Sequence, residues 1–182
     1  MFKFNHKTIE ELERKAQSGD VAAQTKLGAM YVQDKNYVKA VGLFEKAANK
    51  GYVKALYNLG NMYLSGRGVA KDLKKAAQLF EKAANQGNSK AQYNLGLMYL
   101  KGSSGVPENR EEKAIQLFVR AARQGDPAAQ YRLGLMYMST TMNYFLEAAK
   151  QGHDKAQKQL NFFKSAKENC NQNSFKKPSI KI

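Results

Sequence analysis

The chain has 182 residues, and its 30 Lys and Arg against 15 Asp and Glu give a formal net charge of +15 at pH 7. The length fits one domain, and the charge favours acidic partners without indicating a fold. No apolar run approaches the roughly 18 residues of a membrane span. Residues 1–13 lack the apolar core of a signal peptide, and the single Cys170 excludes an intramolecular disulfide. We therefore expect a cytoplasmic protein, or one exported without a signal peptide, as a secreted effector would be.

The first predicted element is a helix over residues 7–18. Leu12 and Ala16 precede Gly19 at the spacing that a Phe and an Ala have before a glycine in every later unit. Because a glycine adopts the left-handed conformation that ends many helices, this pattern predicts an N-terminal capping helix.

Four units follow, each containing the string A-x-x-x-L-G-x-M-Y and, downstream, F-x-x-A-A-x-x-G. Apolar residues recur at intervals of three and four, so each unit predicts a helix A followed by a helix B. Self-similarity at a period of a few tens of residues indicates a solenoid, in which each unit buries its apolar face only against its neighbours. The predicted units are residues 20–51, 52–87, 88–125 and 126–152.

The starts of the A helices differ in their capping residues. Asp20, Asn88 and Asp126 follow the glycines that end the preceding units, and all three are good N-caps. Tyr52 and His153 hold the same position without a capping side chain, so we expect weaker helix starts there.

The loop between helices A and B varies in length among the first three units. It is short in the first unit, at residues 34–36, and longer in the second and third, at 66–72 and 102–109. Asp72 and Asn109 are the predicted caps of the B helices that follow these longer loops.

The fourth unit is truncated, because Tyr137 and Phe145 are 8 residues apart, against 13, 17 and 19 for the same pair in the first three units. Two outcomes are open: a turn collapsed to residues 139–141, or a helix A that runs on into helix B. We predict the tight turn. The sequence then predicts a C-terminal capping helix over residues 153–168 and a disordered basic tail over 169–182, which has too little apolar content to order alone.

The second unit resembles the repeat of the Sel1-like family, a relative of the tetratricopeptide repeat, including Gly66, Gly68, Val69, Asp72 and Lys75. The third unit keeps the pattern with an insertion, and the first lacks the G-x-G-V loop. The resemblance implies an all-α fold, a right-handed α-solenoid of stacked antiparallel helix pairs with about ten helices. It also implies protein–protein interaction, since many members are adaptors, often bacterial, in signalling, envelope or host-interaction processes.

A glycine falls in the middle of each A helix, where it costs about 1 kcal/mol relative to alanine. Close approach of the partner helix is the expected compensation, so we interpret these glycines as packing residues. They are Gly28, Gly60, Gly96 and Gly134.

By resemblance, helix A lines the concave surface of the solenoid, and two rows of its residues face the groove. Successive tyrosines in one row suit peptide recognition, because their rings are rigid and amphipathic. The alternative is that these rings pack as core residues typical of the family. The two rows are Thr25, Tyr57, Tyr93 and Tyr131, and Ala29, Asn61, Leu97 and Leu135, with Lys54 and Lys90 at the helix starts.

A carboxylate clamp is a further hypothesis for the same surface. Some tetratricopeptide proteins hold a C-terminal carboxylate with Lys, Asn and Arg on consecutive A helices, and Asn61, Asn94 and Arg132 occupy matching places. Lys54 or Lys90 would supply the ammonium group. The usual lysine place is occupied by a tyrosine, which argues against the clamp. The predicted partner-binding residues are Lys54, Tyr57, Asn61, Lys90, Tyr93, Asn94, Leu97, Tyr131, Arg132 and Leu135.

No catalytic, metal or cofactor site is predicted. His6, His153 and one cysteine do not make a zinc site, and no strand precedes a glycine-rich phosphate loop. We predict a non-enzymatic adaptor or scaffold that binds a protein or peptide partner in the concave groove. The alternative is a basic module that binds nucleic acid or anionic membrane through charge, with residues 153–182, at a net charge of +5, as the candidate contact. Nothing in the sequence resembles a nucleic-acid module.

Overall fold

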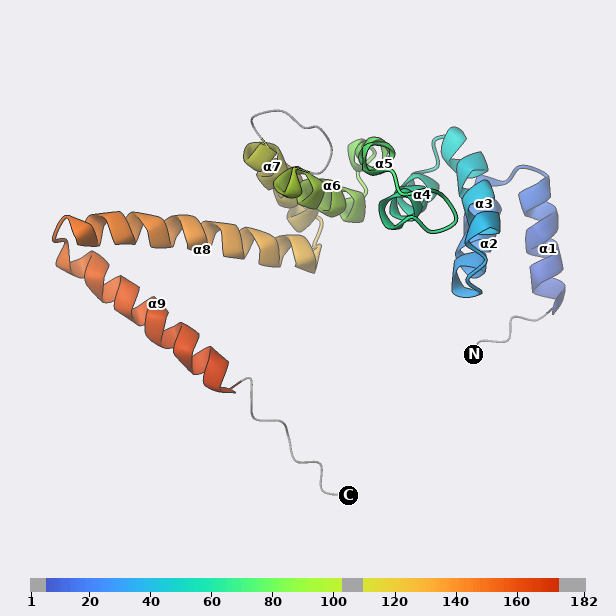
Figure 1. The fold of residues 1–182 in the computed structure, drawn as a ribbon. Coiled ribbons are helices and arrows are strands. Elements are labelled where there is room, and N and C mark those ends of the chain that lie inside the picture. Colours follow the sequence, from blue (N-terminus) through green and yellow to red (C-terminus); the bar gives the residue numbers. More distant parts are fainter. Residues whose placement is uncertain (1–5, 103–109, 174–182) are drawn as a thin grey trace, which may run out of the picture. The chain divides into compact units, whose positions relative to one another are not determined.

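The computed structural model describes residues 6–102 and 110–173, and all regular structure in these ranges is α-helical (Figure 1). The all-α prediction is therefore confirmed. The chain forms two compact units, Met1–Tyr131 and Arg132–Ile182, and the division between them lies inside one long helix.

The first unit is a stack in which each helix packs against the next one along the chain (Figure 1). A capping helix comes first, and its Ala16 is buried with Ala23 and Leu27 of the next helix. Pairs of A and B helices follow, which confirms the predicted α-solenoid. The helices are α1 His6–Gln17, α2 Val21–Gln33, α3 Tyr37–Asn49, α4 Val53–Ser65, α5 Leu73–Asn85, α6 Ser89–Lys101 and α7 Arg110–Arg123.

The second unit contains most of α8, Pro127–Lys150, and all of α9, Asp154–Asn173. Helix α9 continues past residue 168, where the predicted capping helix ends. Its Phe163 ring packs on Phe145 of α8, with the ring centroids 6.1 Å apart. Residues 174–182 of the predicted tail lie outside the described part of the chain.

The predicted turn at residues 139–141 is wrong, because α8 runs without interruption from helix A into helix B of the fourth repeat. In the second and third repeats helix A ends at Gly66 and Gly102, whose φ angles of 71° and 65° are left-handed. The stretch 137–145 holds neither glycine nor proline, so nothing in it stops a helix. Two predicted helices are therefore fused into one.

The predicted helix starts are confirmed with one exception. The side chains of Asp20, Asn88 and Asp126 accept hydrogen bonds from backbone N–H groups three residues on, at 2.8, 2.8 and 3.0 Å. Tyr52 makes no such bond. The prediction that His153 has no capping side chain is wrong, because its Nδ1 accepts a hydrogen bond from the N–H of Ala156 at 3.3 Å.

One of the two predicted caps of the B helices lies among the described residues. The Asp72 carboxylate accepts a hydrogen bond from the Lys75 N–H at 2.9 Å, which confirms its role as the cap of α5. Asn109 lies outside the described residues.

The core of each of the first three repeats centres on a phenylalanine of helix B that packs on the glycine of helix A. Each ring is 0 or 1% exposed, and a Cβ atom added to the glycine would lie 2.6 or 2.7 Å from it. The predicted close approach is thus confirmed for three of the four glycines. Gly134 is the exception, since no atom of the described residues lies within 4 Å of its Cβ position. The three pairs are Gly28–Phe44, Gly60–Phe80 and Gly96–Phe118.

Candidate functional site

A groove of about 650 Å³ crosses the A helices of the first unit, and we call it the A-helix groove. Helix α2 forms one side of it, and the N-terminal turns of α4 and α6 form the rest. The stacking of repeats brings equivalent positions of successive A helices together here. The lining residues are Ala22, Thr25, Lys26, Ala29, Tyr52, Lys54, Tyr57, Asn58, Asn88, Ser89 and Lys90.

The A-helix groove is positively charged. Lys26, Lys54 and Lys90 come from three successive A helices, and none of the described residues that line the groove carries a carboxylate. All three lysines are exposed, and none has an ion-pair partner in the described part of the chain. Lys54 and Lys90 also lie in the first turns of α4 and α6, where the helix dipole adds partial positive charge.

The predicted tyrosine row has two different environments. Tyr57 and Tyr93 are half-buried and pack on Phe80 and Phe118, with ring centroids 6.0 and 5.7 Å apart. Their rings therefore serve the repeat core, as the alternative interpretation held, and Tyr57 also lines the A-helix groove. Tyr131 is 68% exposed.

The other predicted residues divide between the two units. Asn94 Nδ2 donates to Asn61 Oδ1 at 3.2 Å, so these two amides bridge α4 and α6 without lining the A-helix groove. Leu97 is half-buried in α6. Arg132 and Leu135 belong to the second unit. The structure thus brings Lys54, Tyr57 and Lys90 into one groove, together with Thr25 and Ala29.

Sequence reasoning missed Lys26 and Asn58 as groove residues. Both immediately precede the Leu of the A-helix motif, the position that Asn94 and Arg132 occupy in the third and fourth repeats. The sequence contained a signal for them, because Asn94 and Arg132 are predicted binding residues and Lys26 and Asn58 hold the same motif position in the first two repeats.

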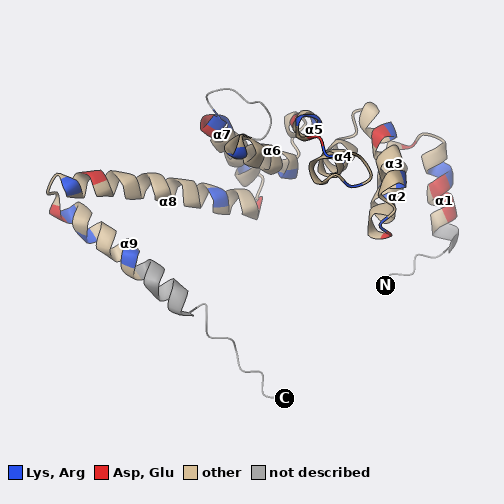
Figure 2. Cartoon of the chain, viewed as in Figure 1, with Lys and Arg blue, Asp and Glu red and all other residues tan. Residues whose placement is uncertain are grey.

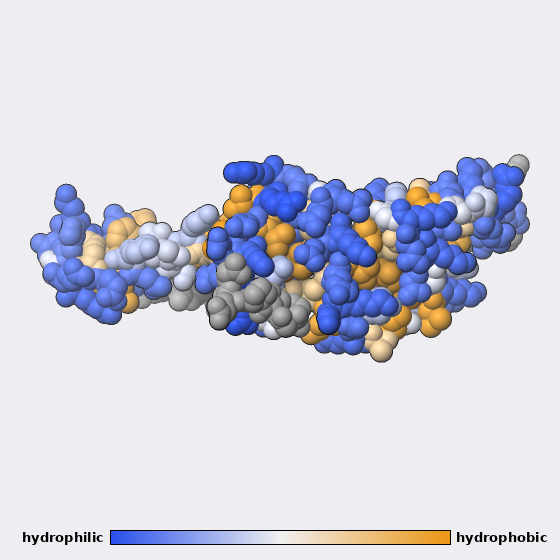
Figure 3. Space-filling model, turned by 90° about the horizontal axis from the view of Figure 1, so that it is seen from above, coloured by the Kyte–Doolittle hydropathy of each residue, from blue (hydrophilic) through white to orange (hydrophobic). Residues whose placement is uncertain are grey.

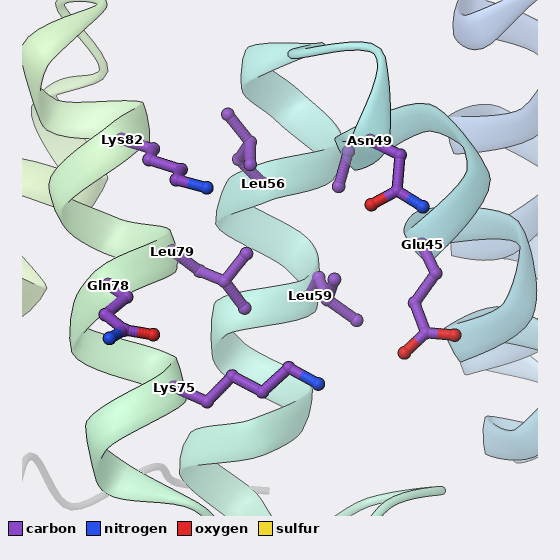
Figure 4. A pocket seen from close by; sticks show the side chains of 9 residues that line it. Glu45, Asn49, Leu56, Leu59, Lys75, Gln78, Leu79 and Lys82 are labelled. Carbon is purple, nitrogen blue, oxygen red and sulfur yellow. The ribbon is translucent and has the colours of Figure 1, made fainter.

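A second groove, of about 500 Å³, was not predicted at all, and we call it the B-helix groove (Figure 4). In Figure 4, Lys75 and Lys82 of α5 extend over Leu56 and Leu59 of α4, with Glu45 of α3 on the far side. The lining residues are Glu45, Ala48, Asn49, Leu56, Leu59, Lys75, Gln78, Leu79 and Lys82.

Charges in the B-helix groove are partly compensated. Lys75 Nζ donates to the Tyr63 hydroxyl at 2.6 Å and lies 4.3 Å from the centroid of that ring. The same hydroxyl donates to Glu45 Oε1 at 3.2 Å. The hydrogen bond to Tyr63, aided by the negative charge of Glu45, raises the pKa of Lys75 above its ordinary value of 10.5. The A-helix groove has no such compensation.

Lys or Arg residues lie on every helix of the first unit (Figure 2). Seen from above, hydrophilic residues cover most of this unit, and hydrophobic residues show between them (Figure 3). None of the described helices has the length and apolar character to cross a membrane. Within the same residues, no three His, Cys, Asp or Glu side chains are grouped to hold a metal ion.

The first unit is a stack of helix pairs packed on their neighbours along the chain, which is the arrangement of helical-repeat solenoids. Within this class, the sequence profile of the Sel1 repeat matches residues 21–52, 53–88, 89–126, 127–139 and 141–153. The chain belongs to the Sel1 repeat family, whose repeats are protein–protein interaction modules. The last two matches meet inside α8, where the structure fuses two helices.

Two solved structures of bacterial proteins are similar to this chain. A Sel1 repeat protein from Oxalobacter formigenes is 37% identical with a TM-score of 0.62, over 70% of this chain and 97% of that one. The protective antigen c5321 from uropathogenic Escherichia coli, described as displaying an SLR fold, is 34% identical with a TM-score of 0.69. That match covers 87% of this chain and 36% of the antigen.

The curated relatives share only a short region with this chain. The ERAD-associated E3 ubiquitin-protein ligase component HRD3 of Candida glabrata is 42% identical over 64 residues, which are 35% of this chain and 8% of that protein. The DAP3-binding cell death enhancer 1 of Rattus norvegicus is 43% identical over 49 residues, 27% of this chain and 10% of that protein. The chain therefore spans about a tenth of these relatives or less.

Proposed function

We propose that the protein is a non-enzymatic adaptor that binds an acidic, extended segment of a partner protein in the A-helix groove. The observation that carries this proposal is the lining of the groove, which contains Lys26, Lys54 and Lys90 and, among the described residues, no carboxylate. Carboxylates of a bound segment would accept charge-assisted hydrogen bonds from three ammonium groups that have no ion-pair partner in the described residues.

The rest of the lining suits a short stretch of polypeptide. A volume of about 650 Å³ matches sites that hold a few side chains and is too small for a folded domain. Tyr52 and Tyr57 add aromatic surface for apolar groups of the segment, and the Asn58 amide offers a donor and an acceptor for its backbone.

Two further observations favour protein over nucleic acid or membrane as the partner. The name of one relative, DAP3-binding cell death enhancer 1, states protein binding. In addition, the chain belongs to the Sel1 repeat family, whose repeats are protein–protein interaction modules.

Peptide selection from a random display library, followed by calorimetry, tests the proposal. We expect the selected peptides to be enriched in Asp and Glu. The variant Lys54→Glu/Lys90→Glu should bind them at least about tenfold more weakly, because two groove contacts become repulsive.

The matched control is Lys74→Glu/Lys82→Glu, which makes the same charge change on α5, outside the A-helix groove. Since both variants have the same net charge, any difference between them reports the groove and not the long-range attraction. Selected peptides without acidic residues, or equal losses in the two variants, would show that the proposal is wrong.

A further inference from the structure

We propose that two copies of this chain associate through α8, with Phe145 of each copy packed on Gly134 of the other. The contact surface is the side of α8 that carries Gly134, Tyr137, Met138, Thr141 and Phe145, and we call it the α8 face. This interface goes beyond the proposed adaptor function and does not depend on it.

Gly134 differs from the other mid-helix glycines in the space around its Cβ position. In the first three repeats, helix B folds back on helix A and places its phenylalanine on the mid-helix glycine, as Phe80 does on Gly60. Helix B of the fourth repeat continues from helix A within α8, so Phe145 cannot reach the glycine of its own chain. Gly134 is exposed, and nothing described lies within 4 Å of its Cβ position. It is therefore the one glycine of the set without compensation for its place in a helix.

The Phe145 side chain is less buried than the equivalent phenylalanines of the other repeats. The equivalent rings in the first three repeats are 0 or 1% exposed, and each packs on the mid-helix glycine of helix A in its own repeat. Phe145 contacts Phe163 of the following helix, α9, but stays only half-buried. Unlike the other three rings, the Phe145 ring has no contact with the mid-helix glycine of its own repeat, Gly134.

Gly134 and Phe145 lie on the same face of the continuous helix α8. They are eleven residues apart, which is close to three turns of about 3.6 residues. The A and B helices of a repeat are antiparallel. A second α8 laid antiparallel on the first would therefore form both glycine–phenylalanine contacts about one twofold axis. Such a self-complementary surface is what a symmetric dimer requires.

The chemistry of the surface agrees with this arrangement. Residues 133–146 contain no charged side chain, and the middle of α8 is tan in Figure 2. Tyr137 and Met138 on the α8 face are 57% and 49% exposed, and Tyr144 and Leu146 beside it are 73% and 45% exposed. A second copy, which brings the same uncharged stretch, would cover these side chains.

Sedimentation equilibrium of the full chain over a wide concentration range tests the dimer. We expect the wild type to dimerise and Gly134→Ala to raise the dimer dissociation constant by at least about tenfold, because the added methyl group would meet the partner's Phe145 ring. Met138→Glu, which places a charge on the α8 face, should weaken the dimer similarly. Gly42→Ala is the matched control, since Gly42 is another exposed helical glycine with nothing within 4 Å of its Cβ position.

Gly134→Ala has room within its own chain, so circular dichroism should show a folded protein at least as stable as the wild type. A wild type that stays monomeric at all concentrations overturns the proposal. So does a Gly134→Ala or Met138→Glu variant that dimerises as tightly as the wild type and Gly42→Ala.

Discussion

Each mid-helix glycine of the first three repeats faces one phenylalanine, and the size of that ring explains why a side chain is excluded. The position of each glycine in the sequence predicts that another helix approaches closely there, because a glycine inside a helix is unfavourable and needs a compensating contact. It does not reveal the partner atom, because any small-residue crossing would give the same pattern. The Phe80 ring, fully buried on Gly60, identifies the contact.

We expect Gly60→Ala to destabilise the fold by about 1–3 kcal/mol, since the new Cβ would lie 2.7 Å from a Phe80 ring that has no space to move. Gly42→Ala should instead stabilise it by about 0.5–1 kcal/mol, because the added methyl group meets nothing and glycine is unfavourable in a helix. Urea unfolding followed by circular dichroism measures both. Equal stabilisation by the two substitutions would refute the packing account.

We expect the charge on Lys75 to make the stability of the fold depend on pH in the alkaline range. The pKa of Lys75 is raised above 10.5, chiefly by the hydrogen bond to Tyr63, so its charged form is favoured in the folded chain. The resulting stabilisation is complete below the unfolded pKa and is lost as the pH rises through the folded one. Above pH 10.5 the wild type should therefore lose more stability than Lys75→Met. The effect should be small because the ammonium group is exposed.

Urea midpoints on either side of pH 10.5 test this expectation. Lys74→Met is the control, because Lys74 lies beside Lys75 on α5 and has no partner among the described residues. If the loss of stability with pH is the same for both variants, the hydrogen bond to Tyr63 does not stabilise the fold.

At the scale of elements, the predictions that succeeded rest on residues with a strong local effect. Asp20 caps α2 and a left-handed Gly66 ends α4, so these boundaries follow from local chemistry. Residues 139–145 contain no such signal, and the predicted turn rested only on analogy with the other repeats. The cap at His153 was missed because an imidazole nitrogen is an uncommon N-cap acceptor.

The continuity of α8 can be tested by NMR. We expect the Cα chemical shifts of residues 139–145 to be helical, and their amides to exchange more slowly than those of an open turn, because each amide has an intrahelical acceptor. Random-coil shifts and fast exchange at residues 139–141 would restore the two-helix description of the fourth repeat.

At the scale of the whole molecule, a site arises where repeats place equivalent residues side by side. Lys54 and Lys90 were predictable because both hold the second position of an A helix, and repeats stacked in register bring such positions together. Arg132 and Leu135 belong to the second unit, and their part in partner binding stays a prediction. Local sequence pattern carries no information on where a stack is divided.

The most direct measurement is NMR titration of the isotopically labelled full chain with an acidic peptide obtained by display selection. We expect the largest amide shift changes at the α2, α4 and α6 residues of the A-helix groove, around Lys26, Lys54 and Lys90. Changes centred on the B-helix groove around Lys75 and Lys82, or spread evenly over the basic surface, would contradict it.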